Sequence, residues 1–211
     1  MGLDIVVGVL VDVIRTFVSA YIRNSSPKPT SYNSSTAPAL STDVLTALAV
    51  LRNRDAAHDQ GEAVDLSLCE LYGANLHSAG LRRADLYNVD AEAANLSHAD
   101  LRGAYLHFAD MTAVDLTRAN LEGADLSGAN LGGANLLGAD LRDADLRGAS
   151  LTSPKNPSVS QATAITVAQL LKAKIDKTTV LPSGLANDPQ VRKAIVAAGA
   201  RSPDGATTPP R

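Results

Sequence analysis

A spacing of five residues governs the middle of this 211-residue chain. From residue 66 to residue 151, every fifth position carries an aliphatic side chain, with no slip in register. The eighteen positions are Leu66, Leu71, Leu76, Leu81, Leu86, Ala91, Leu96, Leu101, Leu106, Met111, Leu116, Leu121, Leu126, Leu131, Leu136, Leu141, Leu146 and Leu151. A small residue, usually Ala, stands two places before each of them, and Asp or Asn usually lies between. Any fold of this chain must give these positions a common environment.

Neither a helix nor a long strand can do so. In an α-helix with this spacing, successive Leu residues would lie about 140° apart around the axis and would share no face. In a long strand, the odd spacing would point them to alternate faces. All of them share one interior only if the chain bends once in every repeat and stacks turn upon turn. We therefore predict a solenoid with these eighteen residues in its core.

The other repeat positions suit such a bend. Side chains two apart point the same way in extended backbone, so the small residue and the Leu both face inward. The Asp or Asn between them can bond nearby backbone groups at the bend. Gly often stands two places after the Leu, where a bend needs permissive backbone; these glycines are at positions 73, 103, 123, 128, 133, 138 and 148. Cys69, the one cysteine, takes an inward position, so we expect an inert buried thiol and no intrachain disulfide.

Units of the form Ala-(Asp/Asn)-Leu-x-x resemble the pentapeptide repeat family over residues 63–152. The resemblance implies a mainly β fold: a right-handed quadrilateral parallel β-helix with four repeats per coil, N-terminal helices and a C-terminal helical cap. With coils about 4.8 Å apart, the rod would be roughly 20 Å long. Gly80 and Tyr105 depart from the pattern, because they stand where Asp or Asn is usual.

The segments around the repeats predict further units. They are an apolar N-terminal helix at 1–23, a Ser/Pro-rich linker at 24–41, a cap helix at 42–62, the repeats at 63–152, a C-terminal cap at 153–200 with helices over Ala164–Lys174 and Pro189–Ala200, and a disordered tail at 201–211. For 1–23, three interpretations stay open: a helix on or in a membrane, a self-associating helix, or a helix packed on its own protein. A spanning helix would place Asp12 and Arg15 near the bilayer centre, at several kcal/mol. We expect a location in the cytoplasm or at the cytoplasmic face of the membrane.

No catalytic or cofactor-binding pattern is present in the sequence. It shows no Ser/His/Asp or Cys/His constellation and no Gly-rich phosphate loop, and a core of Leu and Ala leaves no cavity for chemistry. His77, His98 and His107 fall at outward positions, where two neighbouring histidines without a third ligand do not make a metal site. We therefore predict no enzyme activity, no cofactor and no metal.

The charges bear on which partners the rod can bind. With 19 basic and 22 acidic residues, the totals argue against direct nucleic-acid binding. Some pentapeptide repeat proteins mimic duplex DNA and protect type II topoisomerases, which makes that role an alternative here. Residues 63–152 hold 13 acids and 6 Arg, but ten of the acids sit at the bend position that the repeat itself requires. The outward positions that vary freely carry three acids against six Arg, so these charges lean away from mimicry.

A candidate contact surface comprises Arg82, Arg102, Glu122 and Arg142, which are twenty residues apart and would stack with four repeats per coil. It can be a patch for a protein or small anion, or a solvated salt-bridge ladder. Leu68, Phe108 and Leu137 are outward apolar residues that can also mark a binding surface. We predict a non-enzymatic scaffold or protein-interaction module with an unidentified protein partner, tethered to a membrane through residues 1–23. The alternatives are a topoisomerase protector and a cytosolic homo-oligomer.

Overall fold

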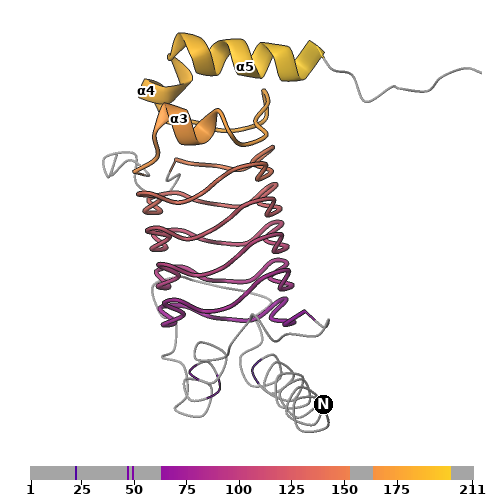
Figure 1. The fold of residues 1–211 in the computed structure, drawn as a ribbon, viewed down its shortest axis with the longest axis vertical. Helices are drawn as coiled ribbons and strands as arrows, with labels where there is room; N and C mark the ends of the chain where they lie inside the picture. Colours follow the sequence, from indigo (N-terminus) through magenta and orange to yellow (C-terminus); the bar gives the residue numbers. More distant parts are fainter. Residues whose placement is uncertain (1–21, 23–46, 48, 50–62, 153–163, 201–211) are drawn as a thin grey trace, which may run out of the picture.

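The structure is a computed structural model that describes residues 22, 47, 49, 63–152 and 164–200. Residues 63–152 form a rod of stacked coils, and the C-terminal helices gather at one end of it (Figure 1). The described part thus has two regions: a repetitive rod and the segment that covers its C-terminal end.

Each repeat makes one tight turn. In the first turn, the Cys69 N–H donates to the Leu66 carbonyl over 3.3 Å, and Leu68 between them has a φ of 59°. A hydrogen bond that closes four residues, with positive φ at the third alone, defines a type II turn. Positive φ recurs at every fifth residue from 68 to 148. The chain therefore bends once per repeat, as the odd spacing of the Leu residues requires.

Four turns close one coil, because each repeat pairs with the repeat twenty residues further on. Parallel bridges join Asp65 to Asp85, and the same step continues through the repeats to the bridge between residues 130 and 150. At the first bridge, the Leu66 N–H donates to the Asp85 carbonyl over 2.8 Å, and the Asp85 N–H donates to the Val64 carbonyl over 2.8 Å. The pairing consists of isolated bridges, since little extended backbone separates one turn from the next. The predicted solenoid is confirmed, and its coils are held together by short parallel pairings.

The interior of the rod is a column of aliphatic side chains. All eighteen residues at the five-residue spacing are exposed by 2% or less, and the small residues two places before them are buried as well. Each fully buried Leu stabilises the rod by about 2 kcal/mol relative to an exposed one. Ala opposite Leu keeps the column narrow, so packed side chains fill the space inside the coils.

The segment after the repeats does not form the long helix that the sequence predicted over Ala164–Lys174. That prediction is wrong, because α3 spans only Val167–Leu170. Thr166 and Gln169 form a capping box at its start, in which the Thr166 hydroxyl accepts from the Gln169 N–H over 3.2 Å. The helix makes one turn, and the chain then returns to extended backbone.

This return continues the coil beyond the repeats. Lys174 bridges to Asp145 and Val180 bridges to Ser150, so the last repeats have partners on their open side. The reason is a five-residue spacing of aliphatic residues that resumes in a new phase, with Ile165, Leu170 and Ile175 buried. Tertiary burial of these side chains outweighs the helical tendency of the segment.

Two further helices complete the C-terminal cap. The helix α4 spans Ser183–Ala186, and α5 spans Pro189–Ala200 and lies outermost on the rod (Figure 1). Val191 of α5 is fully buried in the same core as the repeats. The Gln169 side-chain amide donates to two backbone carbonyls of the last full coil, those of residues 136 and 139, over 2.9 Å each. The cap therefore satisfies both the apolar and the polar groups of the open end.

The predicted units at 1–23, 24–41, 42–62 and 201–211 lie outside the described residues, apart from Ile22, Ala47 and Ala49. These three are helical, and Ile22 is fully buried in the same hydrophobic cluster as the repeats. Among the residues that the structure describes, no helix is both long enough and apolar enough to cross a membrane.

Candidate interaction surface

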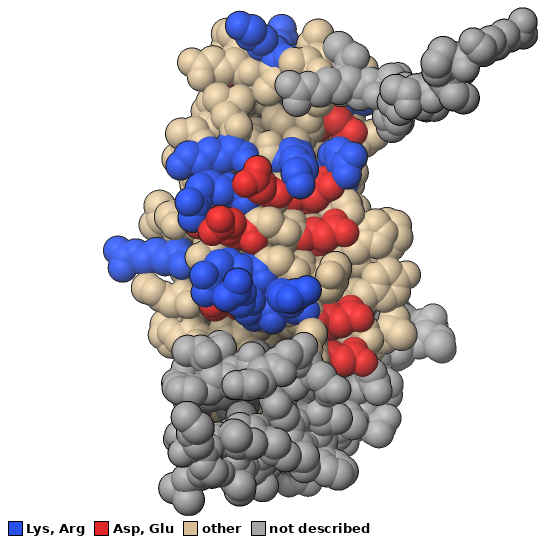
Figure 2. Space-filling view, turned by 45° about the vertical axis from the view of Figure 1, so that its right-hand side comes forward, with Lys and Arg blue, Asp and Glu red and all other residues tan. Residues whose placement is uncertain are grey.

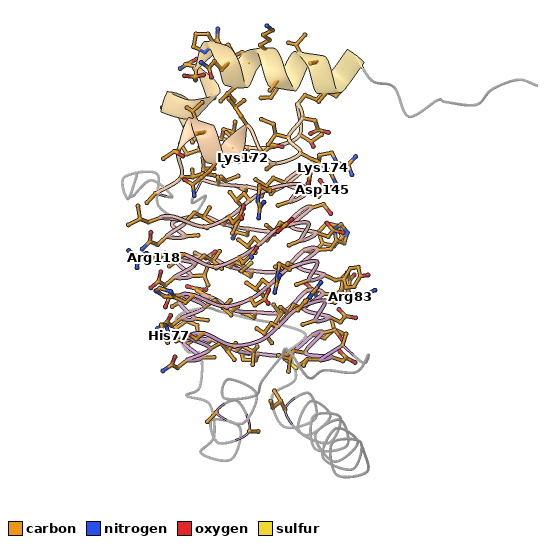
Figure 3. All side chains as sticks on the ribbon, viewed as in Figure 1. His77, Arg83, Arg118, Asp145, Lys172 and Lys174 are labelled. Atoms are coloured by element: carbon orange, nitrogen blue, oxygen red, sulfur yellow. The ribbon has the colours of Figure 1, made fainter. Side chains whose placement is uncertain are left out.

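Outward side chains gather at four corners of the rod, since turn residues twenty positions apart lie on paired coils. The arginine corner holds residues 82, 83, 102, 103, 122, 123, 142 and 143, and the aromatic corner holds 67, 68, 87, 88, 107, 108, 127, 128, 147 and 148. The histidine corner holds 77, 78, 97, 98, 117, 118, 137 and 138, and the fourth corner holds 72, 73, 92, 93, 112, 113, 132 and 133. In Figure 3, Arg83 and Asp145 lie on one side of the rod, and His77 and Arg118 lie on the other. Because Asp145 pairs with Arg147 of the aromatic corner, the arginine and aromatic corners share a side.

The arginine corner carries unpaired positive charge where it begins. Arg82 and Arg83 are both exposed, and neither forms an ion pair among the described residues. Arg102 follows on the next coil, with its Nη2 2.5 Å from Oδ2 of Asp100. Figure 2, in which this side is turned forward, shows one group of basic side chains over the lower part of the described rod and a second group higher up, where acidic side chains lie beside it. The first part of the corner can attract an anionic group.

The later part of the same corner is neutralised within the protein. Nη2 of Arg142 lies 2.9 Å from Oε2 of Glu122 and 2.8 Å from Oδ2 of Asp140. The Arg142 guanidinium holds the pKa of Asp140 below its ordinary value through a side-chain hydrogen bond. The predicted column therefore makes one contact between coils, from Arg142 to Glu122, while Arg102 turns to Asp100 in its own repeat. Of the arginines at this corner, Arg82 and Arg83 are the two without an ion pair among the described residues.

The aromatic corner carries three rings in mutual contact. The ring centroids of His107 and Phe108 are 3.8 Å apart, and Tyr87 lies 6.1 Å from His107 and 6.5 Å from Phe108. The Phe108 side chain is 53% exposed and that of Tyr87 is 42% exposed. Leu68, one coil before, is 48% exposed on the same corner. Exposed rings that are held by their neighbours give a pre-organised apolar contact area.

Tyr105 adds another exposed ring beside this corner. In most repeats the Asp or Asn side chain accepts the N–H of the residue two places on, as Asp85 does from Tyr87 over 3.0 Å and Asp125 does from Ser127 over 2.9 Å. Tyr105 stands at the corresponding position with no carboxylate or amide oxygen, and its side chain is 52% exposed. The repeat gives up a local hydrogen bond here and presents an aromatic surface instead.

The Ser127 and His107 side chains touch without forming a catalytic pair. The His107 Nδ1 lies 2.7 Å from the Ser127 Oγ, which also bonds to Oδ1 of Asp125. A hydroxyl has one proton, and the carboxylate can only accept, so the Ser127 proton goes to Asp125 and the His107 Nδ1 must donate. His107 therefore cannot act as a base toward Ser127 in this arrangement, and the contact fixes the ring.

His77 and His98 lie close together, but among the described residues they belong to no metal-binding group. His77 and His98 lie with ring centroids 5.3 Å apart, and the His77 Nδ1 bonds to the Ser97 hydroxyl over 2.8 Å. Over the described part of the chain, no group of three or more His, Cys, Asp and Glu side chains is placed to hold a metal ion. Cys69 is buried and forms no disulfide with a described residue.

Sequence reasoning picked out some of these residues and missed others. Phe108 and Leu68 were predicted as outward apolar residues, and Tyr105 was noted as a departure from the repeat. Tyr87 was missed, and Arg83 was counted among the outward arginines but left out of the predicted contact surface. Writing the outward residues in rows of twenty would have found both, because Tyr87 then falls directly before His107 in one column and Arg83 falls beside Arg82. The candidate surface is therefore the first part of the arginine corner together with the aromatic corner.

Comparisons with known proteins agree with the repeat pattern. The family model for pentapeptide repeats matches residues 79–118 and 119–153. A pentapeptide repeat protein from Nostoc PCC 7120 with a solved structure is 32% identical, over 63% of this chain and 83% of that one, with a TM-score of 0.42. A pentapeptide repeat protein from the Arabidopsis thaliana thylakoid lumen is also 32% identical, over 47% of this chain and 74% of that one, with a TM-score of 0.31.

A more distant solved structure is that of the plasmid-mediated fluoroquinolone resistance protein QnrB1. It is 17% identical, over 64% of this chain and 63% of that one, with a TM-score of 0.35. Comparison with curated proteins gave no match. The similarity thus lies in the repeats, and it leaves the role of this chain to be argued from its own surface.

Proposed function

This chain belongs to the pentapeptide repeat family, and from that premise we propose that it is a non-enzymatic module that binds a protein partner through the side of its rod. The interior of the rod is packed with aliphatic side chains, so binding must take place outside it. The contact surface that we propose includes Arg82 and Arg102 of the arginine corner, with Glu122 and Arg142 completing the column.

The observation that carries this proposal is the uneven charge of the arginine corner. Arg142 is paired to two carboxylates, and Arg102 is paired to one. Arg82 and Arg83, by contrast, are exposed without an ion pair among the described residues. Arg is enriched at protein interfaces, where its guanidinium binds carboxylates in a fixed geometry. Two adjacent unpaired Arg on a rigid turn favour a partner with acidic groups.

Charge reversal at this corner tests the proposal. Full-length protein, its Arg82→Glu/Arg83→Glu variant and the matched Arg118→Glu variant would each be purified with their bound proteins from the native cell and quantified by mass spectrometry. We expect one protein to co-purify with the unmodified full-length chain and with the Arg118→Glu variant, and to be lost from the Arg82→Glu/Arg83→Glu variant. Recovery of the same proteins with all three, or of none above a tag-only control, would contradict it. Circular dichroism checks that each variant is folded.

We propose further that the module is held at the cytoplasmic face of a membrane through residues 1–23, with 24–41 as a linker. The apolar sequence of 1–23 supports this. Membrane fractionation of the full-length protein and of a version lacking 1–23 tests it, and tethering is wrong if both stay soluble. The competing homo-oligomer predicts that both are soluble and that only the full-length protein sediments as an oligomer.

The topoisomerase-protecting role is a second candidate function. The row of corner carboxylates, including Asp65, Asp85, Asp125 and Asp145 along one column, is the feature that favours it. Arg82 and Arg83, however, are exposed without an ion pair among the described residues, and their charge has the opposite sign to that of a DNA mimic. A supercoiling assay with type II topoisomerase and added protein decides the matter, since unchanged activity removes this candidate.

A further inference from the structure

The aromatic corner contains a strained residue, Phe108, whose side chain is too exposed for its burial to offset the strain. Phe108 stands at the turn position where every described repeat has a positive φ, and its φ of 58° is a conformation that is most strained for bulky side chains. Its ring is more than half exposed, so burial does not offset the strain. A side chain kept in a strained position and turned toward solvent points to a contact outside the rod.

The coil above makes room for that ring. Gly128 lies twenty residues after Phe108, and a Cβ built on it would lie 2.5 Å from Phe108 Cδ1 and 2.6 Å from Cε1. Real Cβ atoms do not approach so closely, so the ring occupies the space that any side chain at 128 would need. His107 packs against the other part of the ring, and its own orientation is set by the bond to Ser127. The ring is therefore held in place before a partner arrives.

The unpaired arginines lie within reach of these rings. Arg83 and Tyr87 are four residues apart, so their Cα atoms can be separated by at most about 14 Å. Arg102 stands five residues before His107 on the next coil. A short extended segment can therefore touch both the charges and the rings.

We propose that Tyr87, Tyr105 and Phe108, together with Arg82 and Arg83, form a docking surface for a protein segment that carries acidic side chains next to an aromatic or aliphatic anchor. The proposal deepens the proposed function, on which it rests, by naming the chemistry of the partner. The guanidinium groups pair with the carboxylates of the segment, and its anchor packs on the rings.

Charge complementarity favours an acidic protein segment over a nucleic acid. The bases of a nucleic acid can stack on exposed rings, but the phosphates that link the bases are repelled by nearby carboxylates. Asp85 and Asp125 lie directly before and after Tyr105 in its column of paired residues. A phosphate chain on these rings would pass over both carboxylates, whereas a protein segment can place its acids toward Arg82 and Arg83 and its anchor toward the rings.

A random-peptide display library selected on the full-length protein tests the proposal. We expect the recovered peptides to be enriched in Asp and Glu close to an aromatic or aliphatic residue. Enrichment of basic peptides, or no enrichment above the empty support, would overturn it. A single-stranded oligonucleotide of mixed sequence serves as the competing probe, and tighter binding of that probe would also overturn it.

Variants then locate the binding site for a synthetic copy of the most enriched peptide. We expect Phe108→Ala and Arg82→Ala/Arg83→Ala each to weaken its binding about tenfold or more, and Arg118→Ala and Leu137→Ala on the histidine corner to leave it within about twofold. Adding salt should weaken binding to the wild type more than to the arginine variant. If only the arginine variant loses binding, the ring part is wrong while the proposed function stands. If the peptide binds all four variants equally, this surface is not its site, whatever the co-purification finds.

Discussion

The first and second halves of the rod use the same core but different turns. In residues 63–118, nine of the turn positions with positive φ carry side chains, at 68, 78, 83, 88, 93, 98, 108, 113 and 118. In residues 119–152, five of the six such positions are glycine, and only Asp143 is not. The inward residues are buried to the same degree in both halves. The two halves thus differ where they face outward and agree where they face inward.

The difference shows where this chain gives up local stability. A left-handed conformation costs a non-glycine residue roughly 1–2 kcal/mol, and glycine adopts it freely. The second half avoids this cost, which shows that the fold does not need side chains there. The first half accepts it and carries the unpaired Arg83 and the exposed Phe108. Its turns are therefore where a binding function has the strongest support.

The largest expected effects come from the core, and they should be equal in the two halves. Leu81→Ala and Leu126→Ala each remove a fully buried side chain, and we expect each to lower the free energy of unfolding by about 2–4 kcal/mol. Leu137→Ala is the matched control, because this Leu is 58% exposed, and it should change stability by less than about 0.5 kcal/mol. Urea denaturation measures all three. A cost at Leu137 as large as at Leu126 would mean that the interior is misassigned.

Two glycines of the second half separate backbone strain from crowding. Gly123 has a φ of 67° and open space around it, so Gly123→Ala should cost about 1 kcal/mol from strain alone. Gly128 has a φ of 69° and faces the Phe108 ring, so Gly128→Ala should cost more. The excess should vanish in a Phe108→Ala background, as measured by a double-mutant cycle in urea. An excess that persists without the ring would show that Phe108 does not occupy the space beside Gly128.

How far sequence could predict these features depends on what carries them. The burial of Leu81 or Leu126 follows from spacing alone, because no other fold gives the odd period one interior. The Arg102 side chain pairs with Asp100 and not with Glu122, and this choice depends on side-chain geometry that cannot be read from the spacing of the residues.

The cap was mispredicted for a related reason. Ile165, Leu170 and Ile175 keep the five-residue spacing, but in a phase shifted from that of the repeats and without Asp or Asn directly before each of them. The short helix α3 between Ile165 and Ile175 resembles the start of a longer one when only local propensity is considered. The docking of this segment on Asp145 and Ser150 is a long-range pairing, which local patterns do not reveal.

A smaller effect is expected when glycine is introduced at turns of the first half, as the second half already has it. Ala93 and Ala113 have φ of 59° and 56°, and glycine relieves that strain at some cost in unfolded-state entropy. We therefore expect Ala93→Gly and Ala113→Gly each to raise the free energy of unfolding by about 0.5–1 kcal/mol. Thermal or urea unfolding measures the change. Destabilisation by either change would mean that the turns of the first half are not strained.

The smallest effect concerns pH, and it should be alike in both halves. The side-chain hydrogen bonds from Arg102 and Arg147 hold the pKa of Asp100 and of Asp145 below their ordinary value of 3.8. Each carboxylate therefore stabilises the fold above that value, and the contribution is lost as pH falls through the lower pKa of the folded state. Asp100→Asn and Asp145→Asn should each flatten the acid limb of the stability curve by less than about 1 kcal/mol, because the arginines are largely exposed. If either variant lost stability more steeply than the wild type as the pH falls, the predicted contribution of that carboxylate would be contradicted.

The stacking of residues twenty positions apart underlies both the core and the four corners, and disulfide formation tests it directly. In a Cys69→Ala background, cysteines at Ser97 and Thr117 would lie on adjacent coils at the same corner, at about the separation that a disulfide requires. Cysteines at Ser97 and Thr112 would lie at different corners. We expect mild oxidation to cross-link the first pair completely and the second pair hardly at all, as read by mass spectrometry of the unreduced protein. Cross-linking of Ser97 to Thr112, or free thiols at both Ser97 and Thr117, would contradict a coil of four repeats.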